Sequence, residues 1–148
     1  MLLADLPETL LHGDCKVGNF AITPEGVAAF DWSWVGRGPC TVDLGWYLAV
    51  NSGRLARPKL DVVAHYRSLL EAALDHRIPE AEWRRLVAVA IACGARMLLW
   101  QKALELANGE PSTKDEWEWW VSAVEQHVVS TVSPGMPVLS HGTGGGVK

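Results

Sequence analysis

Residues 12–32 read HGDCKVGNFAITPEGVAAFDW, and this stretch decides how the rest of the chain is interpreted. Asp14 stands five positions before Asn19, and Asp31 follows the apolar run at residues 27–30. Amide and carboxylate oxygens are hard donors that suit Mg²⁺, and the remaining carboxylate can accept a proton from a hydroxyl group. These are the parts that phosphoryl transfer requires: a metal held against phosphates and a base that orients the attacking hydroxyl.

The residues between Asn19 and Asp31 predict an antiparallel β-hairpin. Residues 20–23 and 27–30 have the composition of short strands, and the sequence Pro-Glu-Gly at 24–26 supplies a turn between them. Because the two ends of a hairpin lie side by side, we expect Asn19 and Asp31 at a common metal ion. An ordinary surface hairpin with an acidic residue at its end is the alternative.

This pattern resembles that of the aminoglycoside phosphotransferase/choline kinase family, which are small-molecule kinases with a protein-kinase-like fold. The family pattern is His-Gly-Asp, four residues, Asn, and then a strand ending in Asp, and the chain matches it at each point. The resemblance implies that Asp14 is the catalytic base and that His12 holds the catalytic loop around it. Asn19 and Asp31 are then the Mg²⁺ ligands, with ATP or GTP as phosphate donor. Lys16 is the candidate contact to a phosphate, and a solvated loop lysine is the alternative.

A loop and a helix start are predicted next, by Gly36-Arg-Gly-Pro39 and by residues 42–50. Asp43 lies in the first helical turn, where free backbone amides favour a carboxylate. In the resembled family the corresponding Asp braces the catalytic loop, and a plain helix cap is the alternative. The segment between Asp31 and Asp43 is short, whereas protein kinases have a long activation segment that binds peptides. The resemblance therefore implies a small-molecule hydroxyl as acceptor, such as that of an aminoglycoside or another amino or sugar alcohol.

Apolar periodicity predicts three further helices up to about Val132. Pro58 opens the first, and Pro79 opens a long second helix that Gly109 ends. The middle of the second helix is apolar nearly all round, so we expect it to be the buried central helix. The third begins near Thr113, where Thr113-x-x-Glu116 is a candidate capping box.

These elements together predict a mainly α fold with one small antiparallel β-hairpin. The resemblance identifies residues 1–132 as the C-terminal lobe of a protein-kinase-like α+β fold. Residues 133–148 are rich in Gly, Pro and Ser and are expected to form a disordered tail.

The N-terminal lobe of such a fold is expected to be absent. Only eleven residues precede His12, too few for the sheet, glycine-rich loop and lysine that hold the ATP phosphates. We therefore expect a fragment that is inactive alone, although its intact parent transfers the γ-phosphoryl group of ATP or GTP. One alternative is a non-catalytic helical interaction module that retains the motif. The other is a metal-dependent phosphohydrolase using Asp14, Asp31 and Asp43, although the chain lacks the metal-binding doublets typical of that class.

Composition restricts the partners of the chain. The net charge of −4 argues against a nucleic-acid partner, and three widely spaced cysteines fit a reducing cytoplasm. The uncharged run at residues 86–95 is too short to span a bilayer, so we expect no membrane partner. Without a covering lobe, apolar side chains near Phe20, Ile22 and Trp32 are expected to promote self-association.

Eight tryptophans and an acidic cluster permit two interpretations. The aromatic rings belong to the core, or some of them stack on a sugar ring of the acceptor. Similarly, the acidic side chains lie on a solvated helix face, or they bind a cationic acceptor. The cluster consists of Asp115, Glu116 and Glu118.

Overall fold

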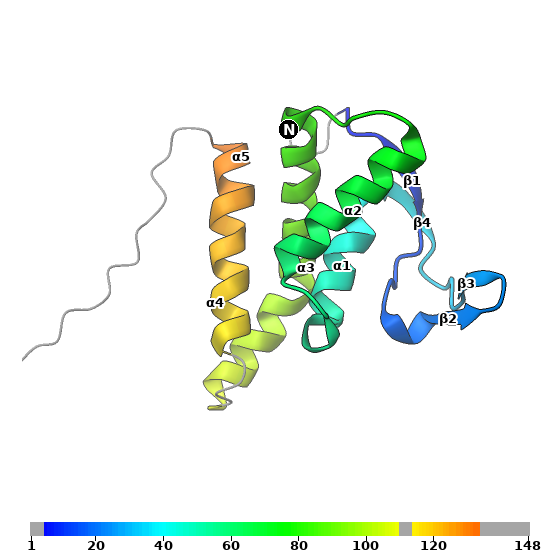
Figure 1. The fold of residues 1–148 in the computed structure, drawn as a ribbon. Coiled ribbons are helices and arrows are strands. Elements are labelled where there is room, and N and C mark those ends of the chain that lie inside the picture. The colour runs from blue at the N-terminus through cyan, green and yellow to red at the C-terminus, as the bar shows by residue number, and fades with distance from the viewer. Residues whose placement is uncertain (1–4, 110–113, 134–148) are drawn as a thin grey trace, which may run out of the picture.

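Two small antiparallel sheets lie beside a group of helices in the computed structural model, which describes residues 5–109 and 114–133 (Figure 1). The first sheet pairs β1 with β4, and the second pairs β2 with β3. The bounds of the strands are β1 Glu8–Leu11, β2 Phe20–Thr23, β3 Gly26–Ala29 and β4 Gly36–Pro39. The helical and hairpin content confirms a mainly α fold with a small antiparallel hairpin.

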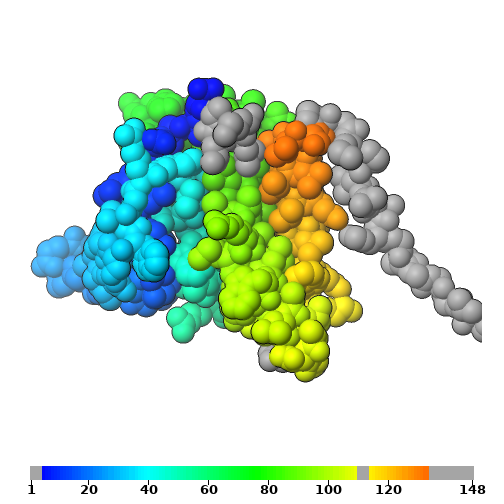
Figure 2. Space-filling view, turned by 180° about the vertical axis from the view of Figure 1, so that it is seen from behind, coloured from blue at the N-terminus to red at the C-terminus, as the bar shows by residue number. Residues whose placement is uncertain are grey.

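The hairpin of β2 and β3 confirms the prediction for residues 20–30. Phe20 pairs with Ala29 and Thr23 with Gly26, so the tight connection falls at the Pro24–Glu25 pair. Gly26 has φ +135°, a conformation that glycine adopts without the steric cost of a Cβ. The hairpin projects from the edge of the molecule, as its blue atoms show in the space-filling view (Figure 2).

The loop prediction for residues 36–39 is wrong, because this segment is strand β4. It pairs antiparallel with β1, with Glu8 opposite Pro39 and Leu11 opposite Gly36. Glycine and proline are poor strand formers on their own, and here the distant partner strand determines the structure. The sheet places the end of β1, where the His-Gly-Asp motif begins, opposite the start of β4, and the start of β1 opposite the end of β4 that leads into the first helix.

Helix predictions in the middle of the chain are confirmed. Pro58 and Pro79 directly precede α2 (Lys59–Leu74) and α3 (Glu80–Ala107). A proline is tolerated there because a backbone N–H at the start of a helix has no partner within the helix. Gly109 has φ +81° just beyond the long helix, as expected for a residue that ends it. The bounds of α1 are Thr41–Val50, and those of η2, a short 3₁₀ turn, are Ser52–Arg54.

Helix α3 is the central helix, as predicted. Its middle part is buried on most sides, including Leu86, Ala90 and Ile91. By length and composition alone α3 is apolar enough to cross a membrane, with a mean hydropathy of 1.4 over its most apolar window. That apolar window extends well beyond the run at residues 86–95. Half of the window is buried against the rest of the protein, which is the pattern of a core helix.

Two glycines allow helices to approach α3 closely. A Cβ on Gly45 of α1 would collide with the backbone carbonyl of Ala90. A Cβ on Gly94 of α3 would collide with the ring of Trp120, which is fully buried. Backbone contact at Gly45 thus brings α1 close to α3, and Leu44 and Leu48 of α1 pack in the same core.

The last helix runs alongside α3 (Figure 1) and contains a π-helical segment. It comprises α4 Lys114–Ala123, the π-helical η4 Val124–Val129 and α5 Ser130–Val132. Thr113 of the expected capping box lies outside the described residues, as do residues 134–148 of the expected tail. The carboxylate of Glu116 instead accepts hydrogen bonds from Ser52 and Lys59, which attach α4 to η2 and α2.

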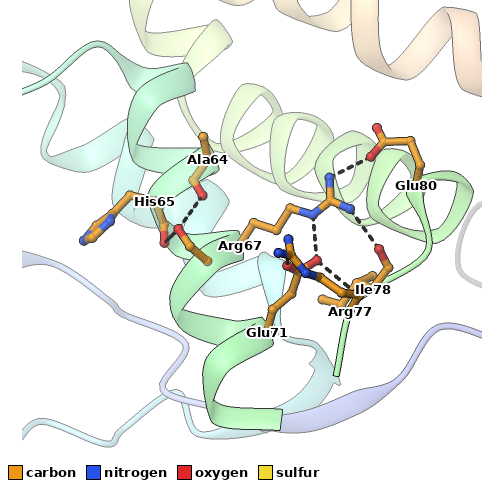
Figure 3. A network of polar contacts seen from close by, with 8 residues as sticks. Ala64, His65, Arg67, Glu71, Arg77, Ile78 and Glu80 are labelled. Carbon is orange, nitrogen blue, oxygen red and sulfur yellow. Dashed lines mark hydrogen bonds and ion pairs between the residues drawn. The ribbon is translucent and has the colours of Figure 1, made fainter. Parts of the chain in front are cut away.

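A polar network fixes the corner between α2 and α3 (Figure 3). The side chain of Glu71 is only 8% exposed, and it accepts hydrogen bonds from Arg67, Arg77 and the backbone N–H of Ile78. Arg67 also donates to Glu80 and to the carbonyl of Ile78. The hydrogen bond from Arg67 is the main cause that lowers the pKa of Glu71. Every oxygen of this buried carboxylate thus has a donor, so the network stabilises the turn between the helices.

Candidate functional site

The loop after β1 carries the His-Gly-Asp motif and ends in the 3₁₀ turn η1, Val17–Asn19. Gly13 has φ +80°, and a Cβ there would collide with the backbone of Trp34. The N–H of Lys16 donates to the carbonyl of Asp14, at 2.8 Å, and that of Asn19 to the carbonyl of Lys16, at 2.9 Å. The loop is therefore a compact turn in which glycine is required at position 13.

Asp43 joins this loop to α1. Its two carboxylate oxygens accept the backbone N–H groups of His12, at 2.7 Å, and of Gly13, at 2.9 Å. These are the contacts that a bracing role requires. With both oxygens engaged in this way, Asp43 is poorly suited to be the third metal ligand of a phosphohydrolase.

His12 is buried and connects the loop to the end of the hairpin. Its Nδ1 accepts the backbone N–H of Asp14, at 3.3 Å, so its Nε2 carries the proton and donates to the carbonyl of Phe30, at 2.9 Å. The ring also lies against Trp32, with 4.6 Å between ring centroids. These contacts orient the residues on either side of the site, and they give His12 a structural place in it.

Asp14 is surrounded by three donors. Its Oδ2 accepts from Lys16 Nζ, at 2.5 Å, and from Asn19 Nδ2, at 3.0 Å. Its Oδ1 accepts from the indole N–H of Trp46, at 2.8 Å. The hydrogen bond from Lys16 is the largest influence on its pKa, and with those from Trp46 and Asn19 it outweighs partial burial, so the pKa lies below the usual value of an aspartate. Asp14 is therefore ionised at neutral pH, as a general base must be.

Asn19 and Asp31 lie at the two ends of the hairpin. The N–H of Phe30 donates to the carbonyl of Asn19, at 3.1 Å, which holds these ends together. The amide nitrogen of Asn19 is directed at Asp14, to both its carboxylate and its carbonyl, so Oδ1 is the atom of this side chain that a metal would use. Asp31 is exposed, has φ +60° and accepts a hydrogen bond from Ser33.

An amide and a carboxylate oxygen fit Mg²⁺, because this ion binds through few protein ligands and keeps several waters. Within residues 5–109 and 114–133, no group of three or more His, Cys, Asp or Glu side chains is arranged to hold a metal ion. Asn19 and Asp31 therefore remain candidate donors only, and a pair of this kind would suit a metal that also binds phosphate oxygens.

Two residues at the site were not found by sequence reasoning. The sequence offers Trp46 only as one of eight tryptophans, and nothing in it singles out Asn51. Asn51 is 1% exposed, and its Oδ1 accepts the N–H of Val17, at 3.0 Å. Asp43, Trp46 and Asn51 therefore hold three successive parts of the loop along the length of α1.

The acidic cluster divides between the two interpretations considered for it. Asp115 and Glu118 are exposed, whereas Glu116 accepts hydrogen bonds from Lys59, Ser52 and Trp120, each at 2.7 Å. Burial raises the pKa of Glu116, but these hydrogen bonds together lower it by more, so the pKa lies below the usual value of a glutamate. The carboxylate of Glu116 is occupied within the fold.

The tryptophans are also divided. Trp83 and Trp120 belong to the core, whereas Trp32, Trp34 and Trp100 are exposed. The half-buried ones are Trp46, Trp117 and Trp119.

A cavity of about 570 Å³ lies behind the loop. It is lined by His12 and Asp43 from the site and mostly by apolar or aromatic side chains of β1, the hairpin, α1 and α2. Asp14, Asn19 and Asp31 do not line it. The cavity is therefore adjacent to the candidate site without containing its reactive groups.

Comparison with known proteins gives one family match. The model of a family described as "Phosphotransferase enzyme family" matches residues 1–87, which include every residue placed at the site above. No curated protein and no solved structure matches the chain.

Proposed function

The chain belongs to the phosphotransferase enzyme family, and from this membership we propose that it is the C-terminal lobe of a small-molecule kinase. The parent enzyme transfers the γ-phosphoryl group of ATP or GTP to a hydroxyl of a small molecule, such as an aminoglycoside or another amino or sugar alcohol. Asp14 is the base that accepts the proton of that hydroxyl.

The observation that carries this proposal is the direct bonding of Lys16 and Asn19 to one oxygen of Asp14. It supports a base that is kept ionised and has one oxygen engaged by the loop, as the positioning of an attacking hydroxyl needs. Asp43 supports the same geometry through the backbone of the loop.

Asn19 and Asp31 would hold Mg²⁺ in this proposal. The ion would neutralise charge on the phosphate oxygens during transfer. Lys16 is the candidate phosphate contact. Its side chain is 40% exposed, so its ammonium group can approach a phosphate from the side open to solvent while it remains paired with Asp14.

We propose that nucleotide binding by the 148-residue chain alone is weak. The described strands pair only as β1 with β4 and β2 with β3, so the described residues form no larger sheet of the kind that carries the phosphate-binding loop and lysine in a kinase-like fold. Positioning of the nucleotide supplies most of the catalysis in this chemistry. Turnover by the chain alone is therefore expected to be very low.

The metal assignment can be tested without nucleotide. Paramagnetic Mn²⁺ should broaden the backbone amide signals of residues 14, 19 and 31 first, and Asp31→Asn should remove that effect. Asp75→Asn is the matched control, because Asp75 is also an exposed aspartate with positive φ. Equal broadening in both variants, or broadening centred elsewhere, contradicts the assignment.

The reaction is tested by following ATP consumption with a panel of amino and sugar alcohols, using the chain alone and the chain joined to its upstream coding sequence. We expect Mg²⁺-dependent transfer only in the longer protein, and Asp14→Ala should abolish it. Transfer that survives Asp14→Ala refutes the role of this residue. Robust turnover by the short chain refutes the argument for a missing lobe.

The exposed hairpin favours a second property, self-association. Ile22 is 94% exposed, and Val27 on the facing strand is 72% exposed. We propose that this apolar hairpin surface is the contact between copies of the chain. A non-catalytic interaction module would use the same surface.

Three cysteines without a disulfide partner support a cytoplasmic location.

A further inference from the structure

We propose that Trp46 is a positioning residue for Asp14. Its indole N–H binds Oδ1 of the carboxylate and leaves one acceptor position on that oxygen open, so that Oδ1 is the atom that accepts the proton of the acceptor hydroxyl. The second half of this inference rests on the proposed function, because it takes Asp14 as the base. The first half concerns only the geometry of the loop and α1.

Trp46 reaches the loop because of its place on α1. It follows Asp43 by three residues, and residues at this spacing lie on one face of a helix. Asp43 binds the backbone of His12 and Gly13, and Trp46 binds the side chain of the next residue, Asp14. Gly45, between them, is in backbone contact with α3. The indole is therefore fixed by the same helix that fixes the loop.

The hydrogen bonds of the two carboxylate oxygens differ. An ionised carboxylate has about four acceptor positions, two on each oxygen. Oδ2 accepts from both Lys16 and Asn19, so both of its positions are filled. Within the described part of the chain, Oδ1 accepts only from Trp46. One position on Oδ1 is thus left for a hydroxyl, and it lies beside the indole ring.

Trp46 also restricts rotation of the carboxylate about its Cβ–Cγ bond. Lys16 and Asn19 both hold Oδ2, so a donor on Oδ1 is needed to fix the plane of the group. Without the indole, Oδ1 would bind solvent in no fixed direction, and the hydroxyl would approach a less defined acceptor. The hydrogen bond from Trp46 also contributes to the lowered pKa of Asp14, after the larger effects of Lys16 and of burial.

The test uses NMR spectra of the indole N–H groups in the full 148-residue chain. Asp14→Asn should shift the Trp46 indole signal more than that of any other tryptophan, because it replaces a charged acceptor with a neutral one. Trp32 is the internal control, since its indole donates to the neutral carbonyl of Ala29. An unchanged Trp46 signal, or a larger shift at Trp32, overturns the proposed contact.

A second measurement reads Asp14 directly. At neutral pH, Trp46→Phe should shift the carbon NMR signal of the Asp14 carboxyl group, because the variant removes the donor on Oδ1, whereas Trp32→Phe should leave that signal unchanged. A merely structural role for the ring would not produce this selective shift. An unchanged Asp14 carboxyl signal in a folded Trp46→Phe variant refutes the positioning role, and the Asp14→Asn experiment decides the case if that variant does not fold.

These experiments separate the inference from the proposed function, because they need neither nucleotide nor acceptor. If the NMR signals show that Trp46 responds to Asp14→Asn, but the Asp14→Ala variant still transfers phosphate, the contact is supported and the role of Asp14 as base is refuted. If Trp46 does not respond to Asp14→Asn, but transfer requires Asp14, the contact is refuted and the role of Asp14 as base still stands.

Discussion

Replacing Asp43 with asparagine is expected to destabilise the fold strongly although the two side chains have nearly the same shape. The carboxylate accepts two backbone N–H groups, at 2.7 and 2.9 Å. An asparagine offers one oxygen and turns its NH₂ group toward the second N–H donor, so one hydrogen bond is lost and a donor is left without a partner. His12, whose N–H is the closer of the two, is buried.

The size of the effect follows from these contacts. A hydrogen bond to a charged group contributes roughly 1.5–3 kcal/mol, and an unsatisfied buried donor costs about 1–3 kcal/mol. The bond to Gly13 is near solvent, so we place the total for Asp43→Asn at the lower end, about 2–3 kcal/mol. For a chain of this length that is a fall in melting temperature of about 4–12 °C.

Urea denaturation monitored by tryptophan fluorescence, together with thermal unfolding, measures this loss. Asp61→Asn is the matched control, because Asp61 is likewise the third residue of its helix but is exposed. We expect it to change stability by no more than about 0.5 kcal/mol. If both variants unfold at the same urea concentration, the two hydrogen bonds of Asp43 do not stabilise the loop and the reasoning fails.

Three other changes test the fold. Gly45→Ala should lower the free energy of unfolding by about 1–3 kcal/mol, because its Cβ meets a carbonyl of α3. Thermal melting followed by circular dichroism measures this loss, and the control Gly53→Ala should have little effect because its Cβ meets nothing within 4 Å. The pKa of Glu116 is held below its usual value, because burial raises it less than the hydrogen bonds from Lys59, Ser52 and Trp120 together lower it. Its ionised form therefore stabilises the fold above about pH 4.5, and this contribution is lost as the pH falls through the lowered pKa of Glu116. The difference in the free energy of unfolding between wild type and Glu116→Gln should therefore shrink when it is measured from pH 7 down to pH 3. Ile22→Thr should reduce self-association in light scattering without lowering the melting temperature, and unchanged association would exclude the hairpin as the contact.

Local patterns in the sequence predict much of this fold. The hairpin follows from a Pro-Glu-Gly turn between two short apolar strands, and α2 and α3 follow from periodicity with a proline before each helix. The strand β4 could not be predicted in this way. Its sequence, Gly-Arg-Gly-Pro, favours a loop, and it forms a strand only because β1 lies beside it about 28 residues away in the chain.

The candidate site shows the same division. The loop motif identifies Asp14 and Asn19, and the structure joins them by a hydrogen bond. The partner role of Trp46 depends on how α1 is rotated about its axis, and that rotation is set by the contact of Gly45 with α3. No local pattern carries this information. Asn51 escapes prediction for a similar reason, because its contact with Val17 spans 34 residues.

The glycine contact between α1 and α3 has a consequence for the order in which the protein takes shape on the ribosome. Helix α1 has ten residues and is too short to be stable alone. The backbone that receives Gly45 is at Ala90, about 45 residues later, which at bacterial and eukaryotic synthesis rates takes about 2–9 s to emerge. Until then Asp43 and Trp46 have no fixed place from which to hold the loop. The His-Gly-Asp segment is thus synthesised early and acquires its geometry late, from residues beyond the part of the chain that the family match covers.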